Sequence, residues 1–265
     1  MGHSLLPGVR AVAIVLLIQA AHALTATVAL AADPDALWKI VHDRCEPAQL
    51  RGAAPDPCQW LDPDQHYAIL KDRDGALQYL LIPTDRVTGI EDPQILSPGA
   101  TNYWERAWEA RRFLEDRAGR PIARDNLTLA INSVSGRSQN QLHIHIDCIR
   151  SELKQELRDN ESRFTANWTP LNPPFHGHPY LVRRITADEL AQTNPFTMLA
   201  NTIPGARADM GHQTLVIAGT TFSSAPDGIY DGFYLLTDHA DPGRGDRASG
   251  EELQDHACAV LNDRP

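Results

Sequence analysis

The chain has 265 residues, of which 42% are hydrophobic and 22% are charged, a composition that suits one globular domain or at most two small ones. Its formal net charge of −10 excludes a protein that binds the nucleic-acid backbone, because such binding requires many Lys and Arg side chains to neutralise phosphates. A phosphorylated small molecule remains compatible with this charge, since one local pocket can be positive on an acidic protein.

Residues 1–32 have the pattern of an export segment. One basic residue, Arg10, precedes the apolar run from Ala11 to Ile18, and a weaker apolar stretch follows. Cleavage after Ala31 would satisfy the small-x-small rule of signal peptides. A retained membrane anchor is the alternative, because the stretch continues to about Ala32 and approaches the roughly 20 residues that a spanning helix needs. In both cases we expect residues 33–265 to be exported as one folded domain.

Four cysteines form an even set in a chain that we expect to enter an oxidising compartment, so disulfides are expected. Three pairings are possible for four cysteines. We favour Cys45 with Cys58, which flank a Pro-rich turn, and this leaves Cys148 to pair with Cys258. A zinc site is disfavoured, because the sequence has no CxxC pair and the spacings match no zinc finger.

The first half of the exported part shows three local patterns. A capped helix is predicted to start near Asp33 or Asp35 and to continue to Cys45. Residues 66–87 contain two short apolar runs around Asp74-Gly75, which predicts a hairpin. Residues 101–119 place aromatic and aliphatic side chains at helical spacing, and we expect these side chains to lie in the core rather than in a binding site.

The rest of the chain adds strands and two helices. Strands are predicted at residues 126–134 and 141–149, with a tight connection between them and a helix at 150–159 after them. Further on we expect a loop at residues 168–180 and strands at residues 180–186, 214–219 and 232–238. A closing helix is predicted at residues 249–261. This order predicts an α+β fold, in which an antiparallel sheet carries helices on one side.

Two histidines stand two residues apart within residues 138–148. On a strand, alternate side chains share a face, so one face carries Gln141, His143, His145 and Asp147. The other face carries Leu142, Ile144, Ile146 and Cys148, which reads as core. Four polar groups are costly beneath a packed surface unless they are paired. We therefore expect the polar face to line a cleft.

Three interpretations of this polar face are open. It could be the solvated side of an antiparallel strand. It could chelate a metal through two imidazoles, which would need a third ligand that the sequence does not identify. It could instead hold an imidazole nucleophile, with Asn132, Ser138 and the turn at Gly136 supplying donors to a phosphoryl oxygen.

Residues 132–147 resemble the active-site strand of the histidine-triad (HIT) superfamily, whose alternating histidines transfer or hydrolyse nucleotidyl groups. More closely, residues 70–84, 130–150, 177–186 and 253–261 resemble the CDP-diacylglycerol pyrophosphatase family of HIT-like hydrolases in bacterial envelopes. The likeness runs from about Leu37 to the C-terminus and includes all four cysteines. It implies a HIT-like antiparallel sheet with flanking helices.

The resemblance implies a role for each residue of the strand. His143 matches the nucleophile of HIT enzymes, and His145 matches the histidine that contacts the phosphate. Ser138 and Asn132 stand where HIT enzymes place polar donors. Gln141 departs from the pattern, because it occupies the place of the first histidine, although an amide can both donate and accept hydrogen bonds. Possible phosphate contacts come from Lys71, Arg137 and His178.

The implied reaction is hydrolysis of CDP-diacylglycerol to CMP and phosphatidate, with no metal and no other cofactor. The implied partners are a membrane lipid substrate and the membrane surface at the periplasmic face of the bacterial inner membrane, to which the protein would be anchored or peripheral; nucleic acid is not among them. Two other functions are open: hydrolysis of a soluble nucleotide diphosphate ester, and a non-catalytic exported module that binds a metal or a lipid. The sequence does not indicate an oligomeric state.

Overall fold

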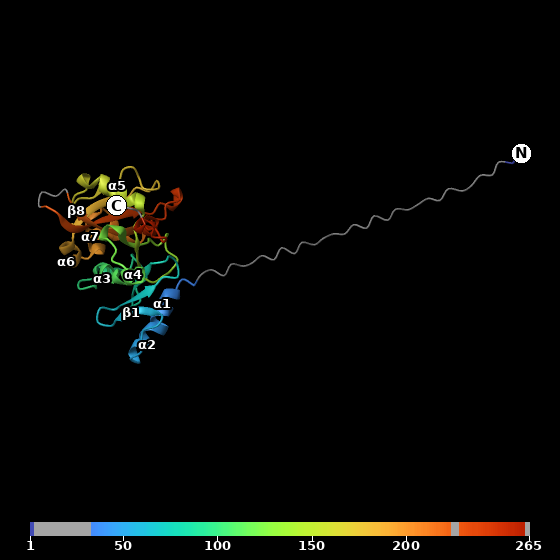
Figure 1. Ribbon diagram of the computed structural model, residues 1–265, viewed down its shortest axis with the longest axis horizontal. Coiled ribbons are helices and arrows are strands. Elements are labelled where there is room, and N and C mark those ends of the chain that lie inside the picture. Colours follow the sequence, from blue (N-terminus) through green and yellow to red (C-terminus); the bar gives the residue numbers. More distant parts are fainter. Residues whose placement is uncertain (3–32, 224–227, 263–265) are drawn as a thin grey trace. The chain divides into compact units, whose positions relative to one another are not determined.

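The computed structural model describes residues 1–2, 33–223 and 228–262 (Figure 1). Contacts between residues divide the chain after Ala32, and the residues from Asp33 onward form one compact unit. The expected signal or anchor segment lies outside the described residues, apart from Met1 and Gly2. None of the described helices is long and apolar enough to cross a membrane.

An antiparallel sheet forms the centre of the unit, and in the described part of the chain it has nine strands in the order β1-β2-β3-β5-β4-β8-β9-β7-β6. The strands are β1 (Cys58–Asp62), β2 (Tyr67–Lys71), β3 (Tyr79–Pro83), β4 (Leu127–Ile131), β5 (Ile144–Cys148), β6 (Thr169–Pro170), β7 (Leu181–Thr186), β8 (Gln213–Phe222) and β9 (Tyr230–His239). The predicted α+β class is confirmed.

The predicted hairpin is β2 and β3, which pair in register from Tyr67 opposite Pro83 to Lys71 opposite Tyr79. Its connection, residues 72–78, contains Gly75 with a φ of +69°, a left-handed conformation that favours glycine. The two strands β1 and β6 were not expected, because β1 follows a Pro-rich stretch and β6 is only two residues long.

The helical segments account for the remaining regular structure. They are α1 (Ala36–Ile40), a π-helical turn (Val41–Cys45), α2 (Glu46–Leu50), α3 (Tyr103–Ala110), α4 (Arg112–Ala118), α5 (Ser151–Asp159), α6 (Ala187–Gln192) and α7 (Pro195–Thr202). Short 3₁₀ helices are η2 (Pro93–Leu96), η3 (Arg124–Asn126), η4 (Glu161–Arg163), η5 (Ala206–Ala208), η6 (Met210–His212), η7 (Pro242–Arg244), η8 (Gly250–Leu253) and η9 (Ala259–Leu261). The first helical run therefore continues to Leu50, beyond the predicted end at Cys45.

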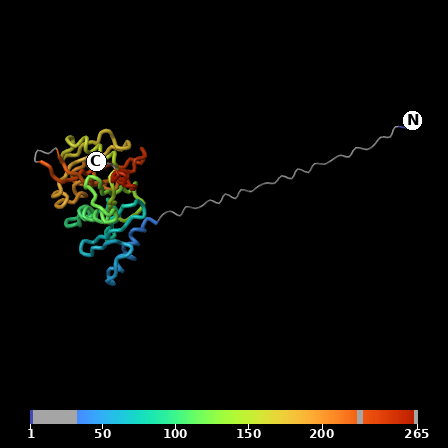
Figure 2. The backbone as a smooth tube through the Cα atoms, viewed as in Figure 1, coloured from blue at the N-terminus to red at the C-terminus, as the bar shows by residue number. Residues whose placement is uncertain are grey.

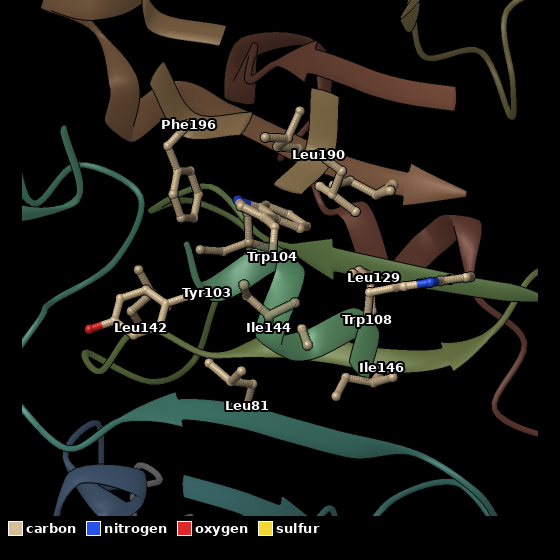
Figure 3. Packing of buried hydrophobic residues seen from close by; sticks show 14 of the residues in the cluster. Leu81, Tyr103, Trp104, Trp108, Leu129, Leu142, Ile144, Ile146, Leu190 and Phe196 are labelled. Atoms are coloured by element: carbon tan, nitrogen blue, oxygen red, sulfur yellow. The ribbon is translucent and has the colours of Figure 1, made fainter. Parts of the chain in front are cut away.

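Helices cover both faces of the sheet, so the expectation of helices on one side is wrong. On one face, Trp104 and Trp108 of α3 pack with Ile144 and Ile146 of β5, and side chains of α4, α6 and α7 join the same cluster (Figure 3). On the other face, the first helical run packs on β1 to β3, and α5 packs on β4, β8 and β9. The reason lies in β8 and β9, which are buried along almost their whole length and so need cover on both faces.

The predicted closing helix over residues 249–261 is also wrong. The structure has two 3₁₀ turns, η8 and η9, and Cys258 between them adopts a left-handed φ of +52°. Tertiary contacts explain this: Cys258 is bonded to Cys148, and the buried amide of Gln254 donates to the carbonyl oxygens of Thr128 and His145. The chain is therefore bound to the sheet between the two turns and does not form a continuous helix. The backbone trace shows this C-terminal stretch in red (Figure 2).

Candidate active site

The histidine strand lies in the interior of the sheet. β5 runs between β3 and β4, where His145 is paired with Leu80 on one side and Ala130 on the other. His143 comes one residue before the strand begins. The two imidazoles lie together with ring centroids 4.8 Å apart, and Ile144 points into the opposite core, as the alternation predicts.

This polar row lies between two apolar clusters on the same face of the sheet. Residues paired directly across strands share a face, so His145 faces the same way as Leu80, which belongs to the cluster under the first helical run. It also faces the same way as Ala130, which belongs to the cluster under α5. The histidines are thus set in a polar strip with apolar packing on either side.

Cys148 departs from the predicted alternation. It packs with Leu153 and Cys258 in the cluster on the histidine side, rather than with Ile146. The strand ends at Cys148, and the Cys148–Cys258 disulfide holds its sulfur on the histidine side. The second disulfide joins Cys45 and Cys58, so the favoured pairing is confirmed.

His143 is held in one tautomer. Its Nδ1 lies 2.7 Å from the backbone carbonyl oxygen of Gln141, which can only accept, so Nδ1 carries the proton. Burial, together with the neighbouring charge of His145, lowers the pKa of His143 to about 4. The ring is therefore neutral at pH 7, and the lone pair of Nε2 is free of any described hydrogen-bond partner.

His145 is held in the other tautomer. The amide Nε2 of Gln78 lies 2.8 Å from His145 Nδ1, so this nitrogen accepts and the proton is on Nε2. The same amide nitrogen lies 3.5 Å from Glu251 Oε1, which supports this orientation of the amide, because an amide oxygen there would repel the carboxylate. His145 Nε2 is buried and has no partner among the described residues. The ring therefore presents an unpaired N–H donor.

The carboxylate of Glu251 also approaches this ring, with Oε1 3.1 Å from His145 Nδ1. A carboxylate only accepts, so that contact alone would favour a proton on Nδ1, whereas the shorter contact with the Gln78 amide favours the Nε2 proton. Burial, followed by the charge of His256, lowers the pKa of His145 to about 3. Both histidines are therefore neutral at pH 7.

Asn132 positions Glu251 rather than presenting a free donor to the histidines. Its Nδ2 donates to Glu251 Oε2 at 2.5 Å, and its Oδ1 accepts from the Glu251 backbone N–H and from the Ser249 hydroxyl, both at 3.2 Å. Gly250 lies so close to the sheet that a Cβ would meet Thr214 Oγ1 at 2.8 Å. These contacts fix the C-terminal segment beside β5.

A second polar pair lies at the end of the histidine row. His256 Nδ1 lies 2.7 Å from Asp147 Oδ2, and this hydrogen bond raises the pKa of His256. Burial raises the pKa of Asp147, although the bond to His256 opposes the rise. The His256 side chain is 41% exposed and the Glu251 side chain 28%, whereas His143 is only 7% exposed. The polar cluster therefore reaches the surface through His256 and Glu251.

Gln141 acts on His143 through its backbone. Its side-chain Nε2 donates to the carbonyl oxygens of Pro83 and Asp85, at 3.0 and 2.8 Å, and thereby holds the chain that follows β3. Only its backbone carbonyl contacts His143. In this structure the glutamine side chain does not take over a hydrogen bond to the nucleophile candidate.

The other predicted residues do not join the histidines. Ser138 is exposed in the β4–β5 connection. Lys71 donates to the carbonyl oxygens of Asp72 and Gly75, and burial lowers its pKa. The guanidinium of Arg137 pairs with both carboxylate oxygens of Glu91, at 2.5 and 2.6 Å. His178 bonds through Nδ1 to Glu252 at 2.7 Å.

Sequence reasoning missed Gln78, Glu251 and His256, which supply side-chain contacts to the histidine strand. The cysteine pairing carried a signal for two of them. A bond between Cys148 and Cys258 brings the C-terminal segment to β5, and with it Glu251 and His256. No comparable signal marked Gln78, because it lies in the hairpin connection.

The metal interpretation requires a third ligand beside the histidines. Groups of three potential ligands do occur in the described part of the chain, but none of them includes His143 or His145. The arrangement instead combines an unprotonated nitrogen on His143 with a buried N–H on His145. A nucleophile and a neighbouring donor suit attack on a phosphorus whose oxygens must be stabilised.

Comparison with known proteins also indicates a reaction at phosphorus. A family model described as CDP-diacylglycerol pyrophosphatase matches residues 32–262. A curated protein from Yersinia pestis, named CDP-diacylglycerol pyrophosphatase, is 46% identical over 231 residues, which is 87% of this chain and 86% of that protein. The residues matched by the family model include the histidine strand and the C-terminal segment that contacts it.

Proposed function

The chain belongs to the CDP-diacylglycerol pyrophosphatase family, and we propose that it hydrolyses the pyrophosphate bond of CDP-diacylglycerol with His143 as the nucleophile. The activity follows from the family, and the products of this cleavage are CMP and phosphatidate. The observation that supports the nucleophile is the bond from His143 Nδ1 to the Gln141 carbonyl, which leaves Nε2 unprotonated.

In the first step, His143 Nε2 forms a bond to the cytidine-side phosphorus, and the bond from that phosphorus to the bridging oxygen breaks. Phosphatidate leaves with the bridging oxygen. The imidazole becomes positively charged, and its Nδ1–H remains bonded to the Gln141 carbonyl oxygen, which stabilises that charge.

His145 supplies the donor that this step needs. Its Nε2–H is buried and unpaired among the described residues, so it can donate to a phosphoryl oxygen without first losing a protein partner. The Gln78 amide holds the ring by donating to Nδ1, and the Glu251 carboxylate lies beside that nitrogen. Gln78 is thus a positioning residue, and His145 touches the substrate.

In the second step, a water oxygen bonds to the phosphorus and the phosphorus–nitrogen bond breaks, which releases CMP and restores neutral His143. We assign the proton of this water to Glu251, a carboxylate whose Oε1 lies 3.1 Å from His145 Nδ1 and whose side chain is 28% exposed. The proton then passes to solvent.

We further propose a HIT-like active site at the periplasmic face of the inner membrane. Two disulfides support an oxidising compartment, and a membrane lipid as substrate supports a location at the membrane surface. The protein is peripheral if residues 1–32 are cleaved and anchored if they are retained. Turnover of CDP-diacylglycerol against water-soluble CDP esters separates the lipid hydrolase from a hydrolase of soluble nucleotides.

The experiment uses purified enzyme and CDP-diacylglycerol micelles in ¹⁸O-labelled water, with CMP release measured. Wild-type enzyme should release CMP that carries the label, since water attacks the cytidine-side phosphorus. His143→Ala should lower the rate by on the order of 10⁴-fold or more. The control His42→Ala removes an imidazole that is 54% exposed and should retain the wild-type rate. Label in phosphatidate, or an active His143→Ala, would contradict the proposal.

A further inference from the structure

A second cluster of ionisable side chains lies beside the C-terminal segment and takes no part in the reaction described above. His178 comes from the stretch before β7, Asp238 from β9, and Asp246 from the loop after η7. One ligand atom from each of the three lies within 4.8 Å of the other two. Asp238 and Asp246 are buried, at 4% and 6% exposed.

Each side chain of this cluster uses one polar atom for a hydrogen bond within the protein. Asp238 Oδ1 accepts from the His239 N–H and Asp246 Oδ1 from the Ala248 N–H, both at 2.8 Å. Asp238 Oδ2 is completely buried and has no partner among the described residues. His178 bonds through Nδ1 to Glu252, which directs the lone pair of Nε2 away from that carboxylate.

The charges of the cluster are not balanced by the protein. In the described part of the chain, neither Asp238 nor Asp246 forms an ion pair with a Lys or Arg side chain. Two adjacent buried carboxylates need either a shared proton or a cation, and an unpaired Asp238 oxygen turned into the cluster leaves room for a ligand bond.

We propose that His178, Asp238 and Asp246 bind a divalent first-row transition-metal cation, with Zn²⁺ as the best match. One imidazole and two carboxylates form a nitrogen–oxygen donor set that suits Zn²⁺. Tetrahedral bonds of about 2.0–2.2 Å place ligand atoms roughly 3.3–3.6 Å apart, so small side-chain movements would close the site. Glu252 accepts the Nδ1 proton of His178, as carboxylates do behind metal-bound histidines.

The cation stabilises the segment that carries Glu251. Glu252 bonds to His178 at 2.7 Å and accepts from the Tyr180 hydroxyl at 2.6 Å, and it directly follows Glu251 in the chain. A metal at this point joins β9, the loop with Asp246 and the stretch before β7. Its role is structural, because neither histidine of the proposed reaction is a ligand.

The test is calorimetric titration of chelator-stripped full-length protein with Zn²⁺ alone, combined with thermal unfolding. Wild type should bind one Zn²⁺ tightly, and its melting temperature should rise by roughly 5–10 °C at a hundredfold excess over Kd. Asp238→Asn should weaken this binding by about 10- to 100-fold or more and remove the thermal shift. Circular dichroism checks that each variant is folded.

The matched control is Asp209→Asn, in the exposed group Asp209, His212 and His239, which also offers three ligands. This control should retain the tight site and its thermal shift. If Asp238→Asn does not fold, Asp246→Asn and His178→Ala replace it, and each should weaken Zn²⁺ binding. The proposal is overturned if wild type binds no Zn²⁺, which would leave a shared proton between the carboxylates. It is also overturned if Asp209→Asn removes the tight site, or if a folded His178, Asp238 or Asp246 variant keeps wild-type affinity.

Discussion

Acidification tests the protonation state of His143. An imidazole must be neutral to attack phosphorus, and burial with the charge of His145 lowers the pKa of His143 from the ordinary 6.5 to about 4. We therefore expect kcat/KM to stay nearly constant from pH 7 to about 5 and to fall only below that.

The expected change in kcat/KM between pH 7 and pH 5 depends on whether the pKa of His143 is about 4 or the ordinary 6.5. At pH 5, a group with a pKa of 4 is about 90% neutral, whereas one with the ordinary value of 6.5 is only about 3% neutral. The ratio of kcat/KM at pH 5 to that at pH 7 should therefore be about 0.9 rather than about 0.04. The comparison is made at pH 5, because the cytosine ring of the substrate begins to take up a proton in more acidic solution.

The assay measures initial rates of CMP release from CDP-diacylglycerol micelles at fixed ionic strength. Acid also destabilises the fold: a histidine whose folded pKa lies below its unfolded value binds more protons when unfolded, so stability present above pH 6.5 decreases toward pH 4. Tryptophan fluorescence at each pH confirms that the enzyme is folded. A fully folded enzyme whose kcat/KM falls with a midpoint near 6.5 would refute the assignment of a buried, neutral His143.

Three further predictions concern the metal, the glutamine and the C-terminal disulfide. EDTA should leave CMP release within about twofold well below the unfolding temperature, because side chains and backbone supply the donors of the reaction; a loss that Zn²⁺ restores would contradict a reaction that needs no metal. Gln141→Ala should lower the free energy of unfolding in urea by about 1–3 kcal/mol, because two loop carbonyls lose their donor, with kcat nearly unchanged; a hundredfold lower kcat at unchanged stability would indicate a direct catalytic role. Replacing Cys148 and Cys258 by Ser should cost about 2–5 kcal/mol in the same urea assay, since the bond closes a separation of 110 residues; an equal urea midpoint would contradict this.

The alternation of β5 could be predicted from sequence because its cause is local. Side chains on a strand alternate between faces, so the shared face of His143 and His145 follows from their spacing. The hairpin around Gly75 and the helix that ends at Gly119 also depend on local backbone conformation. The disulfide pairing could be predicted because Cys45 and Cys58 flank a Pro-rich turn and because an exported chain is expected to form disulfides.

The missing parts of the site depend on long-range contacts. Residues 249–261 have a helical pattern, but Gln254 and Cys258 bind the sheet and prevent a continuous helix. The contact between Glu251 and Asn132 joins residues 119 positions apart, which no local pattern encodes. The same holds for Arg137, whose partner Glu91 could not be inferred from the polar stretch around it.

The covalent role of His143 is tested most directly by trapping the intermediate. Enzyme is mixed with CDP-diacylglycerol carrying ³²P in the cytidine-side phosphate and quenched within one turnover in alkaline detergent, because phosphorus–nitrogen bonds hydrolyse in acid. Peptide mapping then locates the label. We predict label on His143 in wild type, none in His143→Ala, and slow labelling of His143 in His145→Ala. Label on His145 would contradict the account, and so would label retained in His143→Ala. Unlabelled wild-type enzyme with intact hydrolysis and slow CMP release would instead show direct attack by water.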